Sequence, residues 1–235
     1  MKRKIWATAG IAAALAFLIA FGAVGCVVSG FDLPLDSYAK VVLICGAASV
    51  FCAAAFSLKW GGAAVLCALA VASRAAFAWV PHFKPITAVI MLSGMALGAE
   101  TGFLVGAVSA FASGFLFGQG PWTPWQMMAF GIGGYVAGVV QAKGLLPRKP
   151  LAMAFFGFFM IVLVVGPLLD CCTVFTTLTT LTPKAVLAVF GSGVPVNLIH
   201  GACAFLTMLL CGRPLLEKLD RIKEKYGFQE DDHGL

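Results

Sequence analysis

Long apolar runs recur along most of the chain and restrict what it can fold into. About eight can be drawn, at residues 5–29, 39–58, 61–80, 86–99, 102–117, 126–142, 151–169 and 193–212. An α-helix needs about 20 apolar residues to cross a hydrocarbon core of roughly 30 Å. Only 11% of the residues are charged, against about 25% in a typical soluble domain. The chain is therefore predicted to be an all-α integral membrane protein with about eight transmembrane helices.

A turn near Ala99 decides the topology of everything that follows it. As a single helix, residues 86–117 would be roughly 50 Å long, which is too long for one span. If a turn instead falls at Ala99, Glu100 and Thr101, most of the 16 lysines and arginines lie on one side of the membrane. Cytoplasmic loops carry an excess of these residues. The turn is therefore favoured, with both chain ends on the cytoplasmic side of a bacterial cell membrane.

Three regions are predicted along the chain. Residues 1–58 form an N-terminal transmembrane hairpin, and residues 59–213 form a six-helix core that holds nearly all the unusual residues. Residues 214–235 form a charged cytoplasmic tail with one apolar helical face. This tail is either an amphipathic helix on the inner leaflet or a solvated helix that ends the last span. Its apolar face consists of Leu215, Leu216, Leu219, Ile222 and Tyr226.

Small residues recur at every fourth position in the predicted core. Glycines stand at 94, 98, 102 and 106, and such a ladder lets helix backbones approach closely. In the segment 61–80 the ladder is made of alanines on one helical face. This face either packs inside the protein or docks onto another membrane protein, because small side chains lose little rotamer entropy on contact. The alanines are Ala64, Ala68, Ala72 and Ala76.

Polar and aromatic side chains gather near the predicted outer ends of the helices. Arg74 lies within the predicted span 61–80. A cation in such a position usually faces a cavity or a partner protein, or else extends its charged end to the membrane interface. Asp170 is expected to end the seventh helix, with a threonine-rich link over 171–192 before the last span. Together these groups predict an outward pocket for one polar, partly flat ligand. The candidate ligand-binding residues are Arg74, Lys84, Gln119, Trp122, Trp125, Gln126, Asp170, Asn197 and His200.

Some of these candidates have a second interpretation. Trp122 and Trp125 either line the pocket or belong to the aromatic belt at the membrane interface. Asn197 and His200 are expected one helical turn apart at the outer start of the last span, and so on one face. His200 on its own would be a satisfied polar group between helices.

Patterns typical of catalysis are missing from the sequence. It has no Walker A motif, no GxSxG, no HExxH and no paired-carboxylate site. No metal site and no cofactor are predicted, and the cysteines are interpreted as small packing residues. The net charge of +6 reflects topology, since no basic groove with interleaved aromatics indicates nucleic-acid binding. The chain is predicted not to be an enzyme.

Several strings resemble one family of transport proteins. They are RAAF at 74–77, KPITA at 84–88, GFLVGA at 102–107 and, most specifically, GQGPWTPWQM at 118–127. These look like the substrate-binding S components of energy-coupling factor (ECF) transporters, and most like the group linked with cobalamin uptake. The resemblance covers about 61–212 and continues to Lys225–Gly227. The extra hairpin 1–58 is a departure from a minimal six-helix S component.

The resemblance implies a function and partners. The chain would be the substrate-specific subunit of an ECF-type ABC importer for a vitamin or vitamin precursor, with cobalamin-type vitamins favoured. It would capture the vitamin outside the cell and then topple in the membrane against a transmembrane coupling subunit. Two partner ATPases would hydrolyse ATP. The alanine ladder falls where such proteins dock onto the coupling subunit.

Two alternatives remain at this point. The chain is a stand-alone ion- or proton-coupled secondary transporter of a small molecule, with Glu100, Arg74 and His200 as its charge path, or it is a structural membrane scaffold. Glu100 is otherwise interpreted as a carboxylate that caps a helix or interacts with its dipole.

Overall fold

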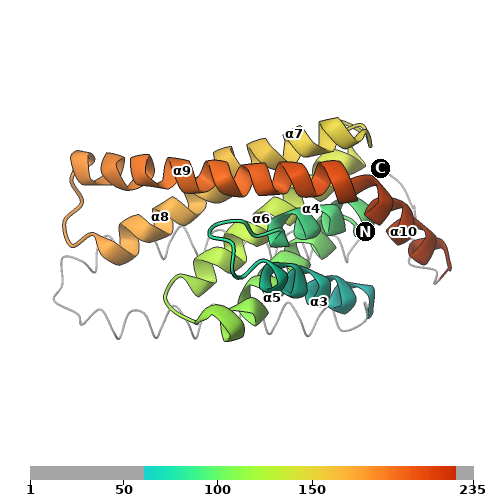
Figure 1. The fold of residues 1–235 in the computed structure, drawn as a ribbon, viewed down its shortest axis with the longest axis horizontal. Helices are drawn as coiled ribbons and strands as arrows, with labels where there is room; N and C mark the ends of the chain where they lie inside the picture. The colour runs from blue at the N-terminus through green and yellow to red at the C-terminus, as the bar shows by residue number, and fades with distance from the viewer. Residues whose placement is uncertain (1–60, 226–235) are drawn as a thin grey trace, which may run out of the picture.

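A computed structural model describes residues 61–225 of the chain. Within this range the protein is helical and contains no strand (Figure 1). The elements are α3 (Gly61–Ala76), α4 (Ile86–Leu97), α5 (Ala99–Phe117), α6 (Thr123–Ala142), α7 (Pro150–Met160), η1 (Ile161–Val165), α8 (Gly166–Thr177), α9 (Pro183–Thr207), η2 (Met208–Gly212) and α10 (Arg213–Lys225). The predicted hairpin 1–58 and the last residues of the tail lie outside the described range.

Three stretches of the described range are long and apolar enough to cross a membrane. They are Ala99–Phe117, Pro150–Thr177 and Pro183–Glu224. Shorter apolar helices cover Ala63–Ala76 and Ile86–Leu97. The all-helical membrane class is therefore confirmed, whereas the total of about eight spans stays a prediction, because the first two predicted spans precede residue 61.

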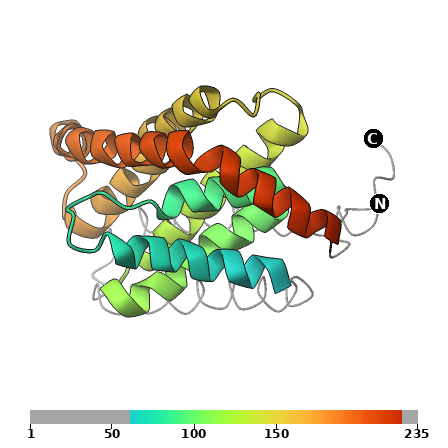
Figure 2. The same ribbon diagram turned by 45° about the vertical axis from the view of Figure 1, so that its right-hand side comes forward.

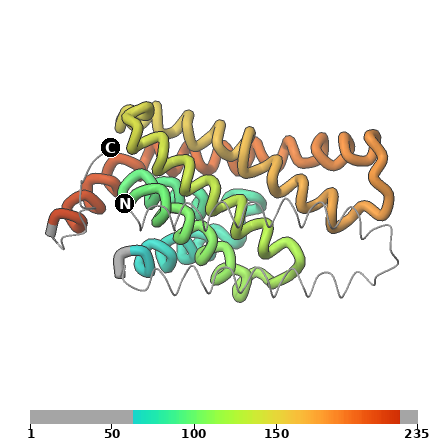
Figure 3. Tube along the Cα trace, turned by 180° about the vertical axis from the view of Figure 1, so that it is seen from behind, coloured from blue at the N-terminus to red at the C-terminus, as the bar shows by residue number. Residues whose placement is uncertain are grey.

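The bundle has two ends with different contents. Successive helices alternate in direction, so the connections 77–85, 118–122 and 178–182 belong to one end, called here the loop end. Gly98, the connection 143–149 and α10 belong to the other, called the tail end. Figures 1 and 3, which view the protein from opposite sides, both place the α8–α9 connection and α10 at opposite ends.

The predicted turn between the fourth and fifth segments is present. Gly98 ends α4 and precedes α5 with φ 96°, a left-handed conformation that glycine adopts without steric cost. Its N–H donates to the carbonyl of Gly94, and its own carbonyl accepts the N–H of Gly102. The single long helix over 86–117 is therefore excluded. The turn lies at Gly98, so Ala99 already belongs to α5.

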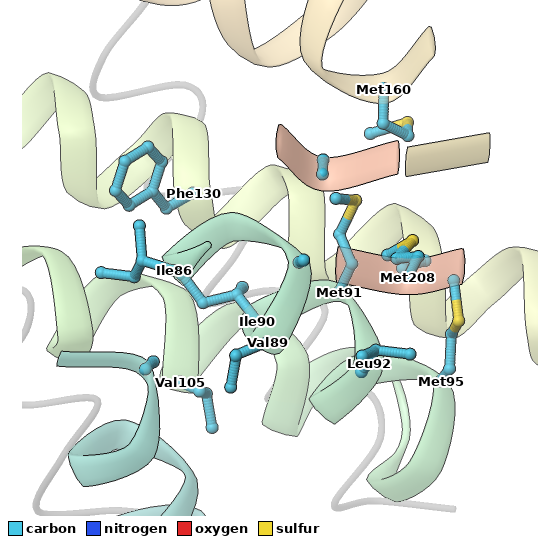
Figure 4. Packing of buried hydrophobic residues seen from close by; sticks show 14 of the residues in the cluster. Ile86, Val89, Ile90, Met91, Leu92, Met95, Val105, Phe130, Met160 and Met208 are labelled. Carbon is cyan, nitrogen blue, oxygen red and sulfur yellow. The ribbon is translucent and has the colours of Figure 1, made fainter. Parts of the chain in front are cut away.

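Helix α4 is the centre of the bundle. Every residue from Ile86 to Ala96 is buried, and the helix packs against α3, α5, α6, α9 and α10. Figure 4 shows large apolar side chains around it, including Ile90, Met91 and Met208. Fully burying one such side chain contributes about 1.5–3 kcal/mol. The apolar segment 86–99 is therefore the core helix of the described range.

Glycines allow α5 and α6 to touch through their backbones. A Cβ atom placed on Gly134 would lie 2.2 Å from the carbonyl oxygen of Gly102, and one on Gly102 would lie 2.5 Å from the carbonyl of Gly134. A side chain at either position would therefore have to push the two backbones apart. The predicted glycine ladder thus packs α4 and α5 onto a common partner, α6.

The two π-helical segments share a sequence feature. Each is followed within two residues by a proline, Pro167 after η1 and Pro214 after η2. A proline inside a helix lacks the N–H donor, and its ring clashes with the carbonyl four residues earlier. Those carbonyls belong to Leu163 and Leu210, which lie within η1 and η2. A wider π turn relieves the clash without ending the helix.

The predicted threonine-rich link 171–192 is wrong. The helix continues through Asp170 to Thr177, and α9 already begins at Pro183, so the connection covers only 178–182. Hydroxyl groups in α8 donate to carbonyls one turn earlier, from Thr173 to Leu169 and from Thr176 to Cys172. Such back-bonding satisfies threonine within a helix. Thr182 accepts the N–H of Ala185 and caps α9.

The described part of the tail forms the predicted amphipathic helix, α10. Leu216 and Leu219 on its apolar face are buried in the main core cluster. The Nζ of Lys223 lies 3.5 Å from the carbonyl of Ala96 at the end of α4. Arg148, in the α6–α7 connection, forms an ion pair with Asp220. Part of the apolar face therefore packs on the bundle rather than on lipid.

Candidate functional site

Helix α3 presents its alanine ladder away from the core. Ala64, Ala68, Ala72 and Ala76 are all exposed. On the other side of the helix, Ala63, Leu66 and Ala70 are buried against the bundle. Among the described helices, α3 lies at the edge of the bundle opposite α7 (Figure 2). The four alanines are therefore not used for packing between described helices and form a flat apolar face.

Arg74 lies near the end of α3 that is at the loop end. One of its terminal nitrogens donates to the hydroxyl of Ser113 on α5, at 2.5 Å. Its guanidinium carbon lies 4.6 Å from the centre of the Phe117 ring, a cation–π distance. The side chain is half-buried. The structure therefore directs this cation into a contact with α5 rather than only toward the interface.

Lys84 holds the α3–α4 connection together. Its ammonium group donates to the carbonyls of Phe77, Ala78 and Val80, at 2.9, 3.1 and 3.3 Å. These carbonyls follow the end of α3, where helix carbonyls lack partners within the helix. All three N–H donors of Lys84 are therefore used inside the loop. Its geometry fits a staple of the connection 77–85 better than a direct ligand contact.

Two histidines meet where this connection reaches α9. The ring centres of His82 and His200 are 6.0 Å apart. His82 has φ 57°, a left-handed conformation that costs a non-glycine residue free energy and persists only where its surroundings impose it. Lys84, two residues after His82, and Arg74 approach the same ring, that of Phe117, at 5.7 and 4.6 Å from its centre. Three elements thus converge, and we call Arg74, His82, Lys84 and His200 the basic cluster.

The GQGPWTPWQ loop is bonded both to itself and to the end of α5. The side chain of Gln119 donates to the carbonyl of Phe111 at 2.9 Å and accepts from the hydroxyl of Thr123 at 2.7 Å. The Trp122 ring covers Gly120, where a Cβ atom would meet it at 2.5 Å. Gln119 is therefore a structural residue of the loop, while Trp122 is 44% exposed.

Trp125 joins α6 to α8. Its ring is stacked on Phe175, with ring centres 5.7 Å apart and an interplanar angle of 17°. Gln126, the next residue, is half-buried, and its side chain makes no hydrogen bond with the described part of the chain. Of the two amides predicted at this loop, Gln126 is the one whose donors and acceptor remain available.

Asp170 and Asn197 bind each other across α8 and α9. The Asn197 amide donates to the Asp170 carboxylate at 2.8 Å. Cβ atoms on Gly166 and Gly193 would collide with Asn197 and Asp170, respectively. Asp170 lies within α8 and not, as predicted, at the end of its helix. Asn197 and His200 lie well inside α9, which begins at Pro183, and not at the start of the last helix. The pair connects the two helices inside their contact.

The structure brings the predicted residues into separate groups at the loop end. Arg74, Lys84 and His200 meet in the basic cluster, whereas Trp125 and the Asp170–Asn197 pair link α6, α8 and α9. Glu100 lies elsewhere: it is in the first turn of α5, 13 residues before Ser113 and so about 20 Å along the helix.

Sequence reasoning missed four partners of these groups, namely His82, Ser113, Phe117 and Phe175. His82 had a signal in the sequence, since it stands between two prolines in the loop PHFKP. The other three are ordinary residues of apolar helices. Their roles come from contacts over long sequence separations, which no local pattern carries.

The fold and the loop-end cluster together define a class of protein. It is a helical, multi-pass membrane protein with polar and aromatic groups at one end and an exposed small-residue face on an edge helix. A family model described as ECF-type riboflavin transporter, S component, matches residues 62–221. The chain belongs to this family, and its predicted membership is confirmed. No curated protein and no solved structure matches it.

Membership in the S-component family establishes the general class of this protein. S components are transport subunits, not enzymes, and in this family they work with a coupling membrane subunit and ATPases. The match covers the described helices almost completely. The cobalamin-linked subtype is not part of what the match shows, and it stays a prediction.

Proposed function

We propose that the chain is the substrate-specific subunit of an ECF-type importer that captures a vitamin or vitamin precursor at its loop end. The observation that carries the proposal is the double role of α3. Its end contributes Arg74 to the basic cluster, while its exposed face consists of alanines. Ligand capture and subunit docking would then be linked through one rigid helix.

In this proposal the loop end faces the outside of the cell. The tail end, in the connection 143–149 and in α10, carries an excess of basic residues, which supports a cytoplasmic location for that end. The protein would lie in a bacterial cell membrane with both termini in the cytoplasm. A vitamin would then meet Trp122, Gln126 and the basic cluster on arrival.

Release of the vitamin would require partners. The alanine face of α3 would dock onto the transmembrane coupling subunit, and the S component would topple so that the loop end reaches the inner side. Small side chains suit an interface that forms and breaks, because little rotamer entropy is lost on contact. Two ATPases would supply the energy, since this chain has no nucleotide-binding motif.

Two vitamins are the leading candidates for the ligand. The name of the matching family mentions riboflavin. The GQGPWTPWQM string at 118–127 supports a cobalamin-type vitamin through its resemblance to the cobalamin-linked group. Riboflavin presents a flat ring system that can stack on aromatic side chains, and both vitamins carry polar groups that can bind amides. We favour the cobalamin-type ligand.

Binding to the purified full chain tests the proposal directly. Isothermal titration calorimetry in detergent, with a panel that contains riboflavin and cyanocobalamin, is expected to give submicromolar binding of one vitamin. Absence of binding across the panel would contradict the proposed function.

Liposomes separate this function from a stand-alone carrier. Vesicles that contain only this chain are expected to take up no vitamin when a proton or sodium gradient is applied. Glu100 supports this expectation, because it lies about 20 Å along α5 from Ser113, the residue that Arg74 binds, and the two charges do not form a pair. Uptake driven by a gradient alone would favour the secondary transporter.

A further inference from the structure

The basic cluster concentrates positive charge where α3, the α3–α4 connection and α9 meet. Arg74 and Lys84 both approach the ring of Phe117, at 4.6 and 5.7 Å from its centre. His82 of the α3–α4 connection and His200 of α9 complete the cluster, with ring centres 6.0 Å apart. Three of the four side chains are at least half-buried.

No carboxylate balances this charge within residues 61–225. The ion pairs between described residues are Arg148–Asp220 and Arg213–Glu217, and both lie at the tail end. Asp170, the described carboxylate of α8, is bonded to Asn197. Cations removed from water need an opposite charge or good hydrogen bonds. The face of Phe117 and one hydroxyl supply only part of that compensation, since a cation–π contact contributes about 0.5–2 kcal/mol.

The hydrogen-bond inventory separates the roles of the two cations. All three N–H groups of Lys84 bind loop carbonyls. Arg74 donates from one terminal nitrogen to Ser113, and the Ser113 hydroxyl itself donates to the carbonyl of Ala110. The other N–H groups of Arg74 have no acceptor among the described residues. A guanidinium fork with free N–H groups matches the oxygens of an anion, particularly a phosphate.

The histidines extend the same donor set. An imidazole ring keeps at least one N–H donor in either protonation state. His82 is held in a strained backbone conformation beside His200, and such strain commonly marks a ligand-binding position. Donors from three elements can surround a tetrahedral anion with charge on several oxygens, whereas one arginine fork is enough for a planar carboxylate.

We propose that the basic cluster binds a phosphate group of the transported ligand, with Arg74 as the main contact, His82 and His200 as further donors and Lys84 as the residue that positions the loop. This inference rests on the proposed function and narrows its substrate class to phosphate-bearing vitamins. A cobalamin carries a phosphodiester in its nucleotide loop. Riboflavin carries no anionic group at neutral pH.

Two matched ligand pairs test the inference on the purified full chain. Riboflavin and flavin mononucleotide differ by one phosphate, and cobinamide lacks the phosphodiester and nucleotide of cobalamin. Calorimetry is expected to show at least about tenfold tighter binding of the phosphate-bearing member in one pair, equivalent to about 1.4 kcal/mol. Equal affinities within each pair, or tighter binding of the phosphate-free member, would overturn the inference but leave the proposed function standing. Absence of binding for all four probes would overturn both.

Variants locate the preference in the cluster. Arg74→Gln is expected to remove the phosphate preference, while Arg74→Lys keeps a part of it because it keeps the charge. Lys184→Gln is the matched control, since Lys184 is exposed at the start of α9 and is expected to leave the preference unchanged. If Arg74→Gln does not yield folded protein, His200→Gln replaces it. A phosphate preference that survives in the neutral variant measured would overturn the assignment.

Discussion

Helices α4, α5 and α6 pack together in a different way from the helices that surround them. The first three approach one another through glycines, with the carbonyl of Gly102 and the backbone of Gly134 in direct contact. Helices α3, α8 and α9 carry exposed side chains on much of their surface, and their contacts with neighbours include Arg74–Ser113, Trp125–Phe175 and Asp170–Asn197. The first region is packed by backbone, and the second is joined by individual side chains.

This difference assigns separate tasks to the two regions. Backbone contacts leave little freedom for two helices to slide, because no side chain can rotate to relieve a collision. Side-chain contacts can be exchanged for contacts with a ligand or another protein. The group α4–α6 therefore acts as the scaffold, and the surrounding helices carry the surfaces that are proposed to bind and dock.

The scaffold should fail when a single methyl group is added to it. Gly134→Ala places a Cβ atom 2.2 Å from the Gly102 carbonyl oxygen, so we expect a loss of about 3 kcal/mol in stability. The melting temperature of the detergent-purified protein, followed by tryptophan fluorescence, measures it. Gly191→Ala in α9 is the control, because nothing lies within 4 Å of its Cβ position. Equal melting temperatures for the two variants would contradict the comparison.

A bulky residue on the alanine face should affect transport and not folding. Ala72→Trp is expected to abolish vitamin uptake in cells that express the complete transporter, because the exposed flat face can no longer meet the coupling subunit. Calorimetric affinity and melting temperature should stay near those of the unmodified chain. Leu187→Trp, at a position 72% exposed on α9, is the matched control and should retain uptake. Loss of binding in Ala72→Trp would refute the docking assignment.

The Asp170–Asn197 pair should behave as a structural contact between α8 and α9. Asn197→Ala leaves the carboxylate without its amide donor, which costs about 1–3 kcal/mol. In a double-mutant cycle with Asp170→Ala, the combined loss should be smaller than the sum of the single losses, as for residues in contact. Thermal unfolding of the four proteins measures this. Additive losses, or reduced vitamin affinity with unchanged melting temperatures, would instead indicate that the pair contacts the ligand.

The smallest effect is expected at the tryptophans. Trp125→Leu removes the stacking on Phe175, which contributes about 0.5–1.5 kcal/mol beyond area burial. Trp122→Leu should change stability less, because Trp122 is 44% exposed and covers its own loop. The difference in melting temperature between the two variants checks this order, and the reverse order would show that the loop, rather than the α6–α8 contact, needs its tryptophan.

Much of the fold could be predicted because it depends on local properties. The length of the apolar segments predicted the helices. The distribution of lysines and arginines predicted the turn, which the structure has at Gly98. The end of α8 could not be predicted in the same way. Threonines at 173, 176 and 177 are typical of loops, yet their hydroxyls bond back to the helix, which no composition rule distinguishes.

The sequence predicted which residues belong to the candidate site better than it predicted what each residue does. Arg74 was singled out because a cation inside an apolar segment needs a partner, but that Ser113 and Phe117 supply the contacts depends on the packing of α3 against α5. Lys84 and Gln119 were expected to contact ligand, and the structure shows Lys84 bonded to carbonyls of its own loop and Gln119 bonded to Phe111 of α5 and to Thr123. A list of polar residues does not say which donors are already used.

The sequence by itself determined the membrane class, the family and the alternation of the core helices. These follow from apolar length, charge distribution and short motifs, which act over a few residues at a time. Only the tertiary structure decided that the alanines of α3 face away from the core and that four basic side chains converge without a described carboxylate. Both depend on how helices distant in sequence pack together, through contacts such as Arg74 of α3 with Ser113 of α5 and His82 with His200 of α9.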